Sequence, residues 1–468
     1  MVKRFSLILT LFLSCAICLS AAGGAGKKNV IFVIADGAGP SVMGFLMQYA
    51  RHAPASSYKG GPSALETLLD ESVLGILSNT PVHTLVSDSA AAGTQMATGT
   101  VTNPLSLGVD AQGNSVPSLL EIAQTKGLAT GLITDVYVTD ATPAAFFAHE
   151  ATRRNYEDLT LALLKTKPDV VLGGGMDYFM SRANLKDPRY QNIIAKMPYG
   201  DSLQPQLKNN EVFEQLLKSG YQLVFDKKGL ASARGSKLMG LFAPVYLPFN
   251  IETKPNYPTL KEMSQKALEI LSKKDKGFFL MIEAGVLDWA LHNKDQGAAL
   301  GELLELDETL AFLMDFVKKN PDTLLVLAAD HDAGGFAFHY HGPPGVKIEN
   351  ADYVSKANLD IIAAQKKSTW ELKKYYDKLP AKDKTPEKIQ KLIKDNMAVE
   401  LPLDFFEKTN NFDDIAAEVG RRLGVTWATT AHTASPLFAA FYGDTTGIRG
   451  GVLTGEQLNK IIAGFMGR

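Results

Sequence analysis

Cysteine is nearly absent from this chain: the 468 residues include two, Cys15 and Cys18, both near the amino end. We expect that end to be removed, so the mature protein would carry no disulfide even in an oxidising compartment. Excess charge is lacking too, because 48 basic residues face 50 acidic ones, and the chain as a whole has no pull toward nucleic acid. Internal repeats and long low-complexity linkers are also absent from the sequence. Packing must therefore supply the stability, with bound metal as a further source.

Residues 1–25 have the order of a secretory signal peptide. Lys3 and Arg4 precede an apolar run at 5–19, and small residues follow at 20–25. An uncleaved membrane anchor is the alternative, but the run is shorter than the ~20 residues of a membrane span; a lipid anchor on either cysteine is the weakest interpretation. We expect an exported protein, periplasmic or secreted, with no stable membrane anchor. Loss of the two basic residues would move the formal net charge from −2 to −4.

The remaining residues, 26–468, have the pattern of one large α/β domain. Their apolar runs are continuous rather than alternating, and they occur at 29–34, 132–138, 170–172, 278–282 and 324–329. Such runs indicate strands buried on both faces of a sheet. Helix-like segments such as 117–126 and 259–272 lie between the runs. The order of strand, helix and strand predicts a mainly parallel central sheet flanked by helices.

The stretch at about 341–423 breaks this pattern. It is rich in lysine, with clusters at 366–367, 373–374 and 391–394 around polar turns, and it is helical in character. We expect a helical or irregular insertion over the active-site side of the sheet. The lysines are interpreted as solvated helix faces rather than as an anion-binding patch.

Acidic side chains follow several of the predicted strands. Asp36, Glu283 and Asp330 each come directly after an apolar run, and His331 follows Asp330. Because the carboxyl ends of parallel strands meet at one edge of a sheet, these side chains should converge on one crevice. The end of a buried strand is an unfavourable place for a carboxylate unless it meets a cation. The positions therefore predict a metal site.

Further candidate ligands lie elsewhere in the chain. Asp288 and His292 stand four residues apart, so on a helix they share one face and can chelate a single ion. His432 supplies a third imidazole. Each of these residues alone is weak evidence, and their occurrence together with the strand-end carboxylates is what predicts the site.

Ser89 lies in the segment Leu-Val-Ser-Asp-Ser-Ala-Ala-Ala-Gly-Thr at 85–94. A free serine hydroxyl is a weak nucleophile at neutral pH, and coordination to a divalent cation is one of the few ways to hold it as an alkoxide. A serine in a chain with these metal-ligand candidates thus predicts a metal-activated nucleophile. No Ser-His-Asp triad is required.

Together these segments resemble the alkaline phosphatase family, in order from residue 29 to about 443, interrupted by the lysine-rich insertion. The matching pieces are Val-Ile-Ala-Asp-Gly at 33–37, Asp-Ser-Ala-Ala at 88–91, Asp-Ala-Thr-Pro-Ala-Ala at 140–145 with Arg153, Glu283 with Asp288 and His292, Ala-Asp-His at 329–331, and His-Thr at 432–433. The resemblance implies an alkaline phosphatase-like fold. It also implies an enzyme that hydrolyses phosphate monoesters through a phosphoserine on Ser89. A homodimer is implied as well, with small-molecule phosphate monoesters as partners and no nucleic acid as a specific partner.

The resemblance further implies two Zn²⁺ and one Mg²⁺ per subunit. It assigns a first zinc to Asp288, His292 and His432, and a second, beside Ser89, to Asp36, Asp330 and His331. It assigns magnesium to Asp36, Thr142 and Glu283, with Asp140 orienting bound water. Imidazole-containing sets suit zinc, and oxygen ligands suit magnesium.

Arg153 is the phosphate clamp that the resemblance implies, because a planar guanidinium fits two phosphate oxygens. The adjacent Arg154 is its competitor. Trp289 stands next to Asp288, where some family members carry a basic residue or histidine. We therefore predict substrate contact by Trp289 and weaker retention of inorganic phosphate. His149 is expected to have a structural role.

The alternatives to a phosphomonoesterase are a related enzyme of the same superfamily and a non-catalytic binding protein. A phosphodiesterase or sulfatase of the same superfamily would share the metal-binding core. Sulfatases need Cys or Ser in a Cys/Ser-x-Pro-x-Arg setting, whereas Ser89 is followed by three alanines. A non-catalytic phosphate-binding protein would need no nucleophile. An ordinary loop role is favoured for His339 and His341.

Overall fold

The computed structural model describes residues 27–252, 255–340 and 353–467. The signal peptide expected at 1–25, both cysteines and His341 lie outside these residues. Within the described part of the chain, no helix is long and apolar enough to cross a membrane.

The centre of the molecule is a ten-stranded sheet with the order β14-β2-β13-β8-β1-β7-β3-β4-β6-β5. The strands are β1 (Lys28–Ala35), β2 (Val73–Ser78), β3 (Ala129–Tyr137), β4 (Val170–Gly174), β5 (Gln222–Val224), β6 (Leu238–Leu241), β7 (Gly277–Ala284), β8 (Thr323–Ala328), β13 (Leu437–Gly443) and β14 (Gly451–Thr454). All of them except β13 run in the same direction. Two small ribbons accompany the sheet, one of β9 (Asp332–Ala333) with β12 (His432–Thr433) and one of β10 (Phe336–Phe338) with β11 (Val425–Trp427). The prediction of a mainly parallel central sheet is confirmed.

The five apolar runs of the sequence are strands β1, β3, β4, β7 and β8, and every residue of β3, β4, β7 and β8 is buried. The sequence did not predict the flanking strands β2, β5, β6, β13 and β14. Several of these are short or have one solvent-facing side, as β2 and β14 do. They therefore lack the continuous apolar signal of a strand buried on both faces.

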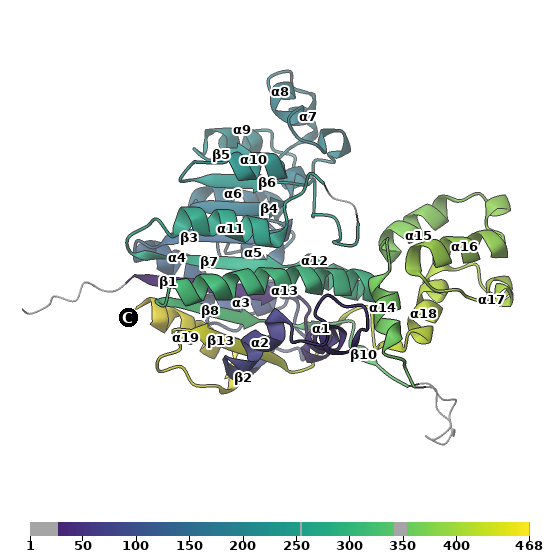
Figure 1. Cartoon of the computed structure of the whole chain (residues 1–468). Helices are drawn as coiled ribbons and strands as arrows, with labels where there is room; N and C mark the ends of the chain where they lie inside the picture. Colours follow the sequence, from purple (N-terminus) through teal and green to yellow (C-terminus); the bar gives the residue numbers. More distant parts are fainter. Residues whose placement is uncertain (1–26, 253–254, 341–352, 468) are drawn as a thin grey trace, which may run out of the picture.

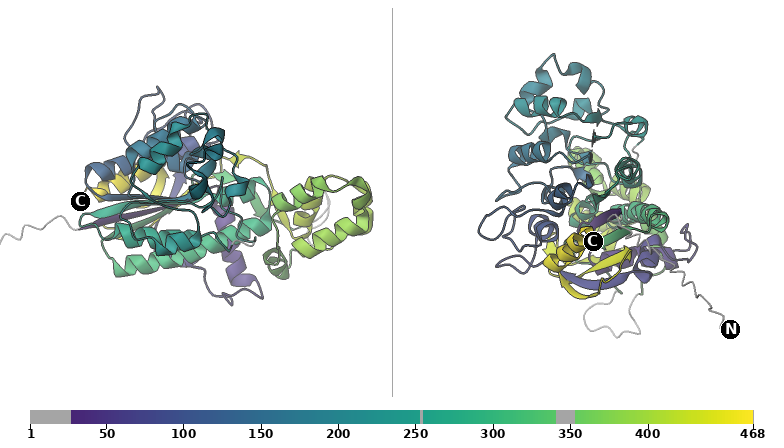
Figure 2. Two further views of the ribbon diagram at one scale, coloured as in Figure 1. Left: turned by 90° about the horizontal axis from the view of Figure 1, so that it is seen from above. Right: turned by 90° about the vertical axis from the view of Figure 1, so that its left-hand side faces the viewer.

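Helices cover both faces of the sheet (Figure 2). The helices of the main body are α1 (Pro40–His52), α2 (Ala64–Asp70), α3 (Ser89–Thr98), α4 (Leu119–Thr125), α5 (Ala141–Ala144), α6 (Tyr156–Thr166), α7 (Arg182–Lys186), α8 (Gln191–Ile194), α9 (Glu211–Lys218), α10 (Lys227–Ser232), α11 (Leu260–Leu271), α12 (Val286–His292), α13 (Gln296–Lys319) and α19 (Gly455–Met466), with short 3-10 turns at Met176–Tyr178 and Gly200–Ser202. Helices α1, α2 and α11 contact α13, whereas α3 and α4 contact α19. The two predicted helices, α4 and α11, each begin at a capping box, in which the first-turn N–H groups are satisfied locally.

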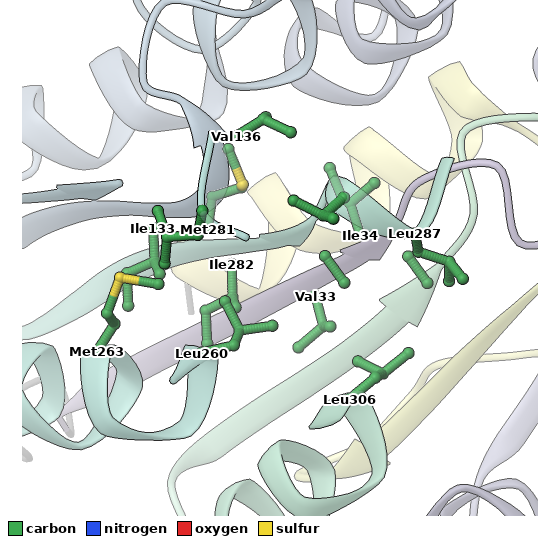
Figure 3. Close-up of a cluster of buried hydrophobic side chains, with 14 of the residues drawn as sticks. Val33, Ile34, Ile133, Val136, Leu260, Met263, Met281, Ile282, Leu287 and Leu306 are labelled. Carbon is green, nitrogen blue, oxygen red and sulfur yellow. The ribbon is translucent and has the colours of Figure 1, made fainter. Parts of the chain in front are cut away.

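A cluster of buried apolar side chains packs between the sheet and the helix layer of α11 and α13 (Figure 3). Val33 of β1 and Ile282 of β7 lie beside Leu260 of α11 and Leu306 of α13, and all four side chains are fully buried. Strand β1 pairs with β7 on one side and with β8 on the other. This packing fixes the ends of the three strands relative to one another, and those ends carry the candidate ligands.

The predicted insertion is helical where the structure describes it. It contains α14 (Ala357–Ala363), α15 (Thr369–Lys378), α16 (Pro386–Met397), α17 (Leu403–Lys408) and α18 (Phe412–Arg422), with a 3-10 turn at Ala381–Asp383. In Figure 1 it lies beyond the carboxyl ends of the parallel strands. The buried Asp295 carboxylate, which caps α13, joins it to the body by accepting hydrogen bonds from the Thr369 N–H at 2.6 Å and from Gln365 Nε2 at 2.7 Å.

Candidate active site

Four adjacent strands of the sheet, in the order β8, β1, β7 and β3, bring the strand-end residues together. Asp36 follows β1, Glu283 lies near the end of β7, and Asp330 and His331 follow β8. Asp140 lies just beyond β3, where its side chain caps α5, the helix that contains Thr142. Asp288 and His292 come from α12, His432 from β12 and Ser89 from the start of α3. The topology therefore gathers all of the residues predicted from the sequence at one edge of the sheet.

The first group of candidate ligands is Asp288, His292 and His432. His292 Nε2 lies 3.2 Å from Asp288 Oδ2 and 3.1 Å from His432 Nε2. His292 Nδ1 donates to the Thr430 carbonyl at 2.6 Å, and His432 Nδ1 donates to the Ser87 carbonyl at 2.8 Å. Because each Nδ1 carries its proton, both Nε2 lone pairs face the same point. Two lone pairs so placed need a shared proton or a cation between them, and carbonyl partners on the far nitrogens are typical of metal-bound histidine.

The second group is Asp36, Asp330 and His331, and all three are buried. His331 Nε2 lies 3.1 Å from Asp330 Oδ2 and 3.5 Å from Asp36 Oδ1. Burial, followed by the charge of neighbouring Asp330, holds the pKa of Asp36 well above its ordinary value. Burial, followed by Asp288, raises the pKa of Asp330 to about 7. The protein alone supplies too little positive charge for these carboxylates, which is the condition that a bound cation relieves.

Unpartnered oxygen atoms test whether the two groups fit metal. The buried atoms Asp36 Oδ1 and Asp288 Oδ1 have no hydrogen-bond partner, and Asp330 Oδ2 makes no hydrogen bond despite its 3.1 Å contact with His331 Nε2. Buried carboxylate oxygens are otherwise paired in folded proteins. Together with the inward-facing imidazoles, they make both groups suitable for a divalent cation that accepts nitrogen and oxygen ligands.

A third group contains only oxygen donors. Thr142 Oγ1 donates to Asp36 Oδ2 at 3.4 Å, and Thr134 Oγ1 donates to Glu283 Oε2 at 2.5 Å. Burial, followed by the charge of Asp140, raises the pKa of Glu283 well above its ordinary value. The donor set suits a hard cation such as Mg²⁺.

Ser89 is the first residue of α3, and its buried Oγ lies 3.2 Å from His331 Nε2. Asp88 caps the helix by accepting hydrogen bonds from the N–H groups of Ala90 and Ala91, each at 3.3 Å. The N–H groups of the second and third residues of α3 are therefore occupied by this carboxylate. The helix also contributes its dipole field at Ser89.

Arg153 reaches the same site from the loop before α6. Its Nη2 lies 2.6 Å from Asp140 Oδ1, and its Nη1 lies 3.6 Å from Asp88 Oδ2. Two carboxylates thus aim the guanidinium, and they raise the pKa of Arg153 further despite its burial. Arg154 is exposed to solvent.

A cavity of ≈ 300 Å³ opens beside Ser89. It is lined by Ser89, Tyr137, Asp140, Arg153, Asp288, Trp289, His292, Asn293 and His432. None of its lining residues belongs to the described part of the insertion. Sequence reasoning missed Tyr137 and Asn293. The place of Tyr137, three residues before Asp140 at the end of a predicted strand, was the one available signal.

The remaining histidines have other surroundings. His149 Nδ1 contacts the Gly108 carbonyl at 2.7 Å, and its Nε2 contacts Glu121 Oε1 at 3.0 Å. His149 therefore joins two segments of the body away from the cavity. His339 Nδ1 lies 3.1 Å from the carbonyl of its neighbour Tyr340, within its own loop.

Fold and site together define a metal-binding hydrolase built on a mainly parallel α/β sheet. The chain belongs to the alkaline phosphatase family, whose model matches residues 27–466. Alkaline phosphatase 4 of Bacillus subtilis is 31% identical over 364 residues, which cover 76% of this chain and 70% of that protein. Alkaline phosphatase of Escherichia coli is 31% identical over 349 residues, which cover 65% of this chain and 70% of that protein.

Solved alkaline phosphatase structures share the fold of this chain. The crystal structure of Thermus thermophilus alkaline phosphatase is 25% identical, with a TM-score of 0.78 over 95% of this chain and 92% of that one. The crystal structure of a cold-active alkaline phosphatase from Shewanella is 24% identical, with a TM-score of 0.76 over 94% of this chain and 100% of that one. The prediction of a phosphomonoesterase is confirmed.

Proposed function

We propose that this protein hydrolyses phosphate monoesters to alcohol and inorganic phosphate through a phosphoserine at Ser89. The observation that carries the proposal is the position of the Ser89 hydroxyl. It lies at the start of a helix, 3.2 Å from His331, between two groups of inward-facing ligands and beside a tethered arginine. A binding protein would need the cations and the arginine, but it would not need a nucleophile at their centre.

The residues of the chain have distinct roles in this proposal. Ser89 Oγ forms a bond to phosphorus as the bond from phosphorus to the alcohol oxygen breaks. A water oxygen then bonds to phosphorus as the bond from phosphorus to Ser89 Oγ breaks, which releases inorganic phosphate and restores the serine hydroxyl. Arg153 binds non-bridging phosphate oxygens with its planar fork and is held in that orientation by Asp140 and Asp88. Ser89 is largely buried at the floor of the cavity, where electrostatic contacts are stronger than in bulk water.

The metal complement is two Zn²⁺ and one Mg²⁺. Asp288, His292 and His432 would hold one zinc, and Asp36, Asp330 and His331 the other. Asp36, Thr142 and Glu283 would hold magnesium, with Asp140 as a partner for its bound water. When bound, such cations lower the pKa of a serine hydroxyl and offset charge on the departing oxygen. A related structure, TAB5 alkaline phosphatase mutant His 135 Asp, is described with Mg bound in its M3 site.

The test is hydrolysis of p-nitrophenyl phosphate and of its bis-ester at alkaline pH by zinc- and magnesium-loaded protein, with Ser89→Ala as the control. We expect monoester turnover that falls by about 10³-fold or more in the variant, because nucleophilic residues of this kind act as a unit with their surroundings. Preferential turnover of the bis-ester would assign a phosphodiesterase instead. If the metal-loaded protein hydrolyses neither ester, the result would favour a non-catalytic phosphate-binding protein.

A homodimer is also proposed, and an apolar sheet face supports it. Ile76 of β2 pairs in register with Val452 of β14, so both side chains lie on one face; they are 56% and 79% exposed. Leu74 of β2 and Leu85, in the loop before Ser89, add to it. Strand β14 is an edge strand, and none of these four side chains is charged. A neutral apolar surface is self-complementary, so a second copy of the chain can cover it.

Sedimentation tests the dimer. Ile76→Glu should shift the loaded protein from dimer to monomer, because an isologous interface would bury the new carboxylate twice. Leu403→Glu, at an exposed leucine of the insertion, is the matched control. A monomeric native protein, or a dimer unaffected by Ile76→Glu, would refute the assignment of this face.

Export to the periplasm or the medium is the last element of the proposal. It rests on the order of charged, apolar and small residues at 1–25. Expression of the full chain in a bacterium with a periplasm should release a mature protein that begins near residue 26, as measured by mass spectrometry. Full-length protein that stays in the membrane fraction would instead support the anchor.

A further inference from the structure

The lining of the cavity beside Ser89 divides into two sets of residues. Six side chains belong to the nucleophile, the arginine clamp and the candidate ligand groups. The three that remain are Tyr137, Trp289 and Asn293. Because the phosphoryl group must lie against Ser89 and Arg153, the alcohol part of a bound ester is left to contact this remaining set.

Each of the two aromatic rings is braced from behind. Trp289 of α12 packs against Tyr246, with ring centroids 4.4 Å apart. Tyr137 of β3 stacks on Tyr178 at 4.5 Å and 24°, and Tyr156 meets it edge-on at 6.3 Å. A ring backed by another ring has little room to swing away, so both surfaces are in place before a ligand arrives.

The polar groups of the same set are largely occupied. Asn293 Nδ2 already donates to the Trp289 carbonyl at 2.7 Å. The Tyr137 hydroxyl has the neighbouring Asp140 carboxylate as a hydrogen-bond partner. A polyhydroxylated alcohol would therefore find few partners here, whereas a flat apolar group would find two aromatic surfaces.

We propose that, given the phosphomonoesterase activity proposed above, this cavity selects monoesters whose alcohol carries an aromatic ring, with Trp289 and Tyr137 as the specificity-determining residues. Contact between a ligand ring and a braced aromatic side chain contributes about 2- to 10-fold to affinity. The selectivity acts on substrate binding, because the rings touch the alcohol and not the transferred phosphoryl group.

The first experiment compares 2-phenylethyl phosphate with glycerol 1-phosphate, since both release an unactivated alkyl alcohol. The expected result is kcat/KM about 5- to 10-fold higher for the phenylethyl ester, carried mainly by a lower KM. Trp289→Leu should reduce that ratio to about 2-fold or less. Trp370→Leu, which removes a tryptophan 40% exposed on the insertion, is the matched control and should leave the ratio unchanged.

The second experiment does not depend on turnover. Calorimetry on metal-loaded protein compares benzylphosphonate with methylphosphonate, neither of which can be hydrolysed. Benzylphosphonate should bind about 5-fold more tightly, and Trp289→Leu should reduce the difference to about 2-fold or less. If no ester is hydrolysed while the phosphonate preference holds, the proposed function fails and the aromatic site stands. Equal binding of the two phosphonates, or a preference that Trp289→Leu leaves undiminished, overturns the inference even in an active phosphatase.

Discussion

Removing the metals should make the stability of this protein depend on pH in a defined direction. In the protein without cations, burial raises the pKa of Asp330 to about 7 from its ordinary 3.8. A carboxyl whose folded pKa exceeds its unfolded pKa stabilises the fold below the unfolded value, and that contribution is lost as pH rises through the folded pKa. The same sign applies to Asp36 and Glu283, whose pKa values are also raised by burial. Bound cations would keep these groups ionised and so remove the loss.

The magnitude follows from Asp330 alone. Above pH 5 the unfolded carboxyl is ionised and the folded one is not, so stability falls by about 1.4 kcal/mol per pH unit. The slope lessens near pH 7, where the folded carboxyl is half ionised, so the total loss between pH 5 and pH 7 is about 2 kcal/mol. For a chain of this length that corresponds to a change in Tm of about 2–3 °C. The lowered pKa of His331 opposes this trend, but His331 is neutral in both forms and cancels in their difference.

The assay is differential scanning calorimetry at pH 5, 6 and 7, with EDTA or with zinc and magnesium. We expect the difference in Tm between loaded and stripped protein to widen as pH rises. Asp177→Asn is the matched control. Burial raises the pKa of Asp177 to about 6, but this residue lies outside both ligand groups. Asp177→Asn should therefore leave the difference in Tm between loaded and stripped protein unchanged at each pH. A difference that is constant or narrows with pH would refute the electrostatic argument.

Three further predictions concern single residues. Arg153→Lys should lower kcat/KM by about 10- to 100-fold, because a point charge cannot replace the planar guanidinium. Arg154→Lys should have little effect. Steady-state kinetics in which both variants behave alike would contradict the assignment of Arg153 as the phosphate clamp. Trp289→Lys should strengthen inhibition by inorganic phosphate, since it adds a positive charge at the cavity. An unchanged inhibition constant would count against the prediction that Trp289 weakens phosphate retention. Asp295→Ala should destabilise the protein by about 2–4 kcal/mol, because the Thr369 N–H would lose its buried partner. Urea unfolding measures that change, and a loss below about 0.5 kcal/mol would show that water replaces the carboxylate.

Much of the candidate site could be predicted from the sequence, because the chemistry of each side chain and its place on a strand or helix can be recognised from a few neighbouring residues. Asp330 at the end of an apolar run and the i, i+4 pair of Asp288 and His292 could be recognised without coordinates, since a strand end and a helix face each fix a direction. Tyr137 was missed for the opposite reason. It continues the apolar run of β3, and only the fold shows that it lines the cavity.

The sequence by itself determined the class of fold and the kinds of candidate metal ligand, because runs of a few residues are enough to indicate a buried strand and the chemistry of its side chains. Tertiary structure decided what those residues do together. The strand order β8, β1, β7 and β3 sets Asp330 and His331 beside Asp36 and Glu283, although these residues lie far apart in the chain. The carbonyls of Thr430 and Ser87 orient the two imidazoles, and Asp140 with Asp88 aims Arg153. Such contacts depend on distances across the sheet edge, and no local pattern encodes them.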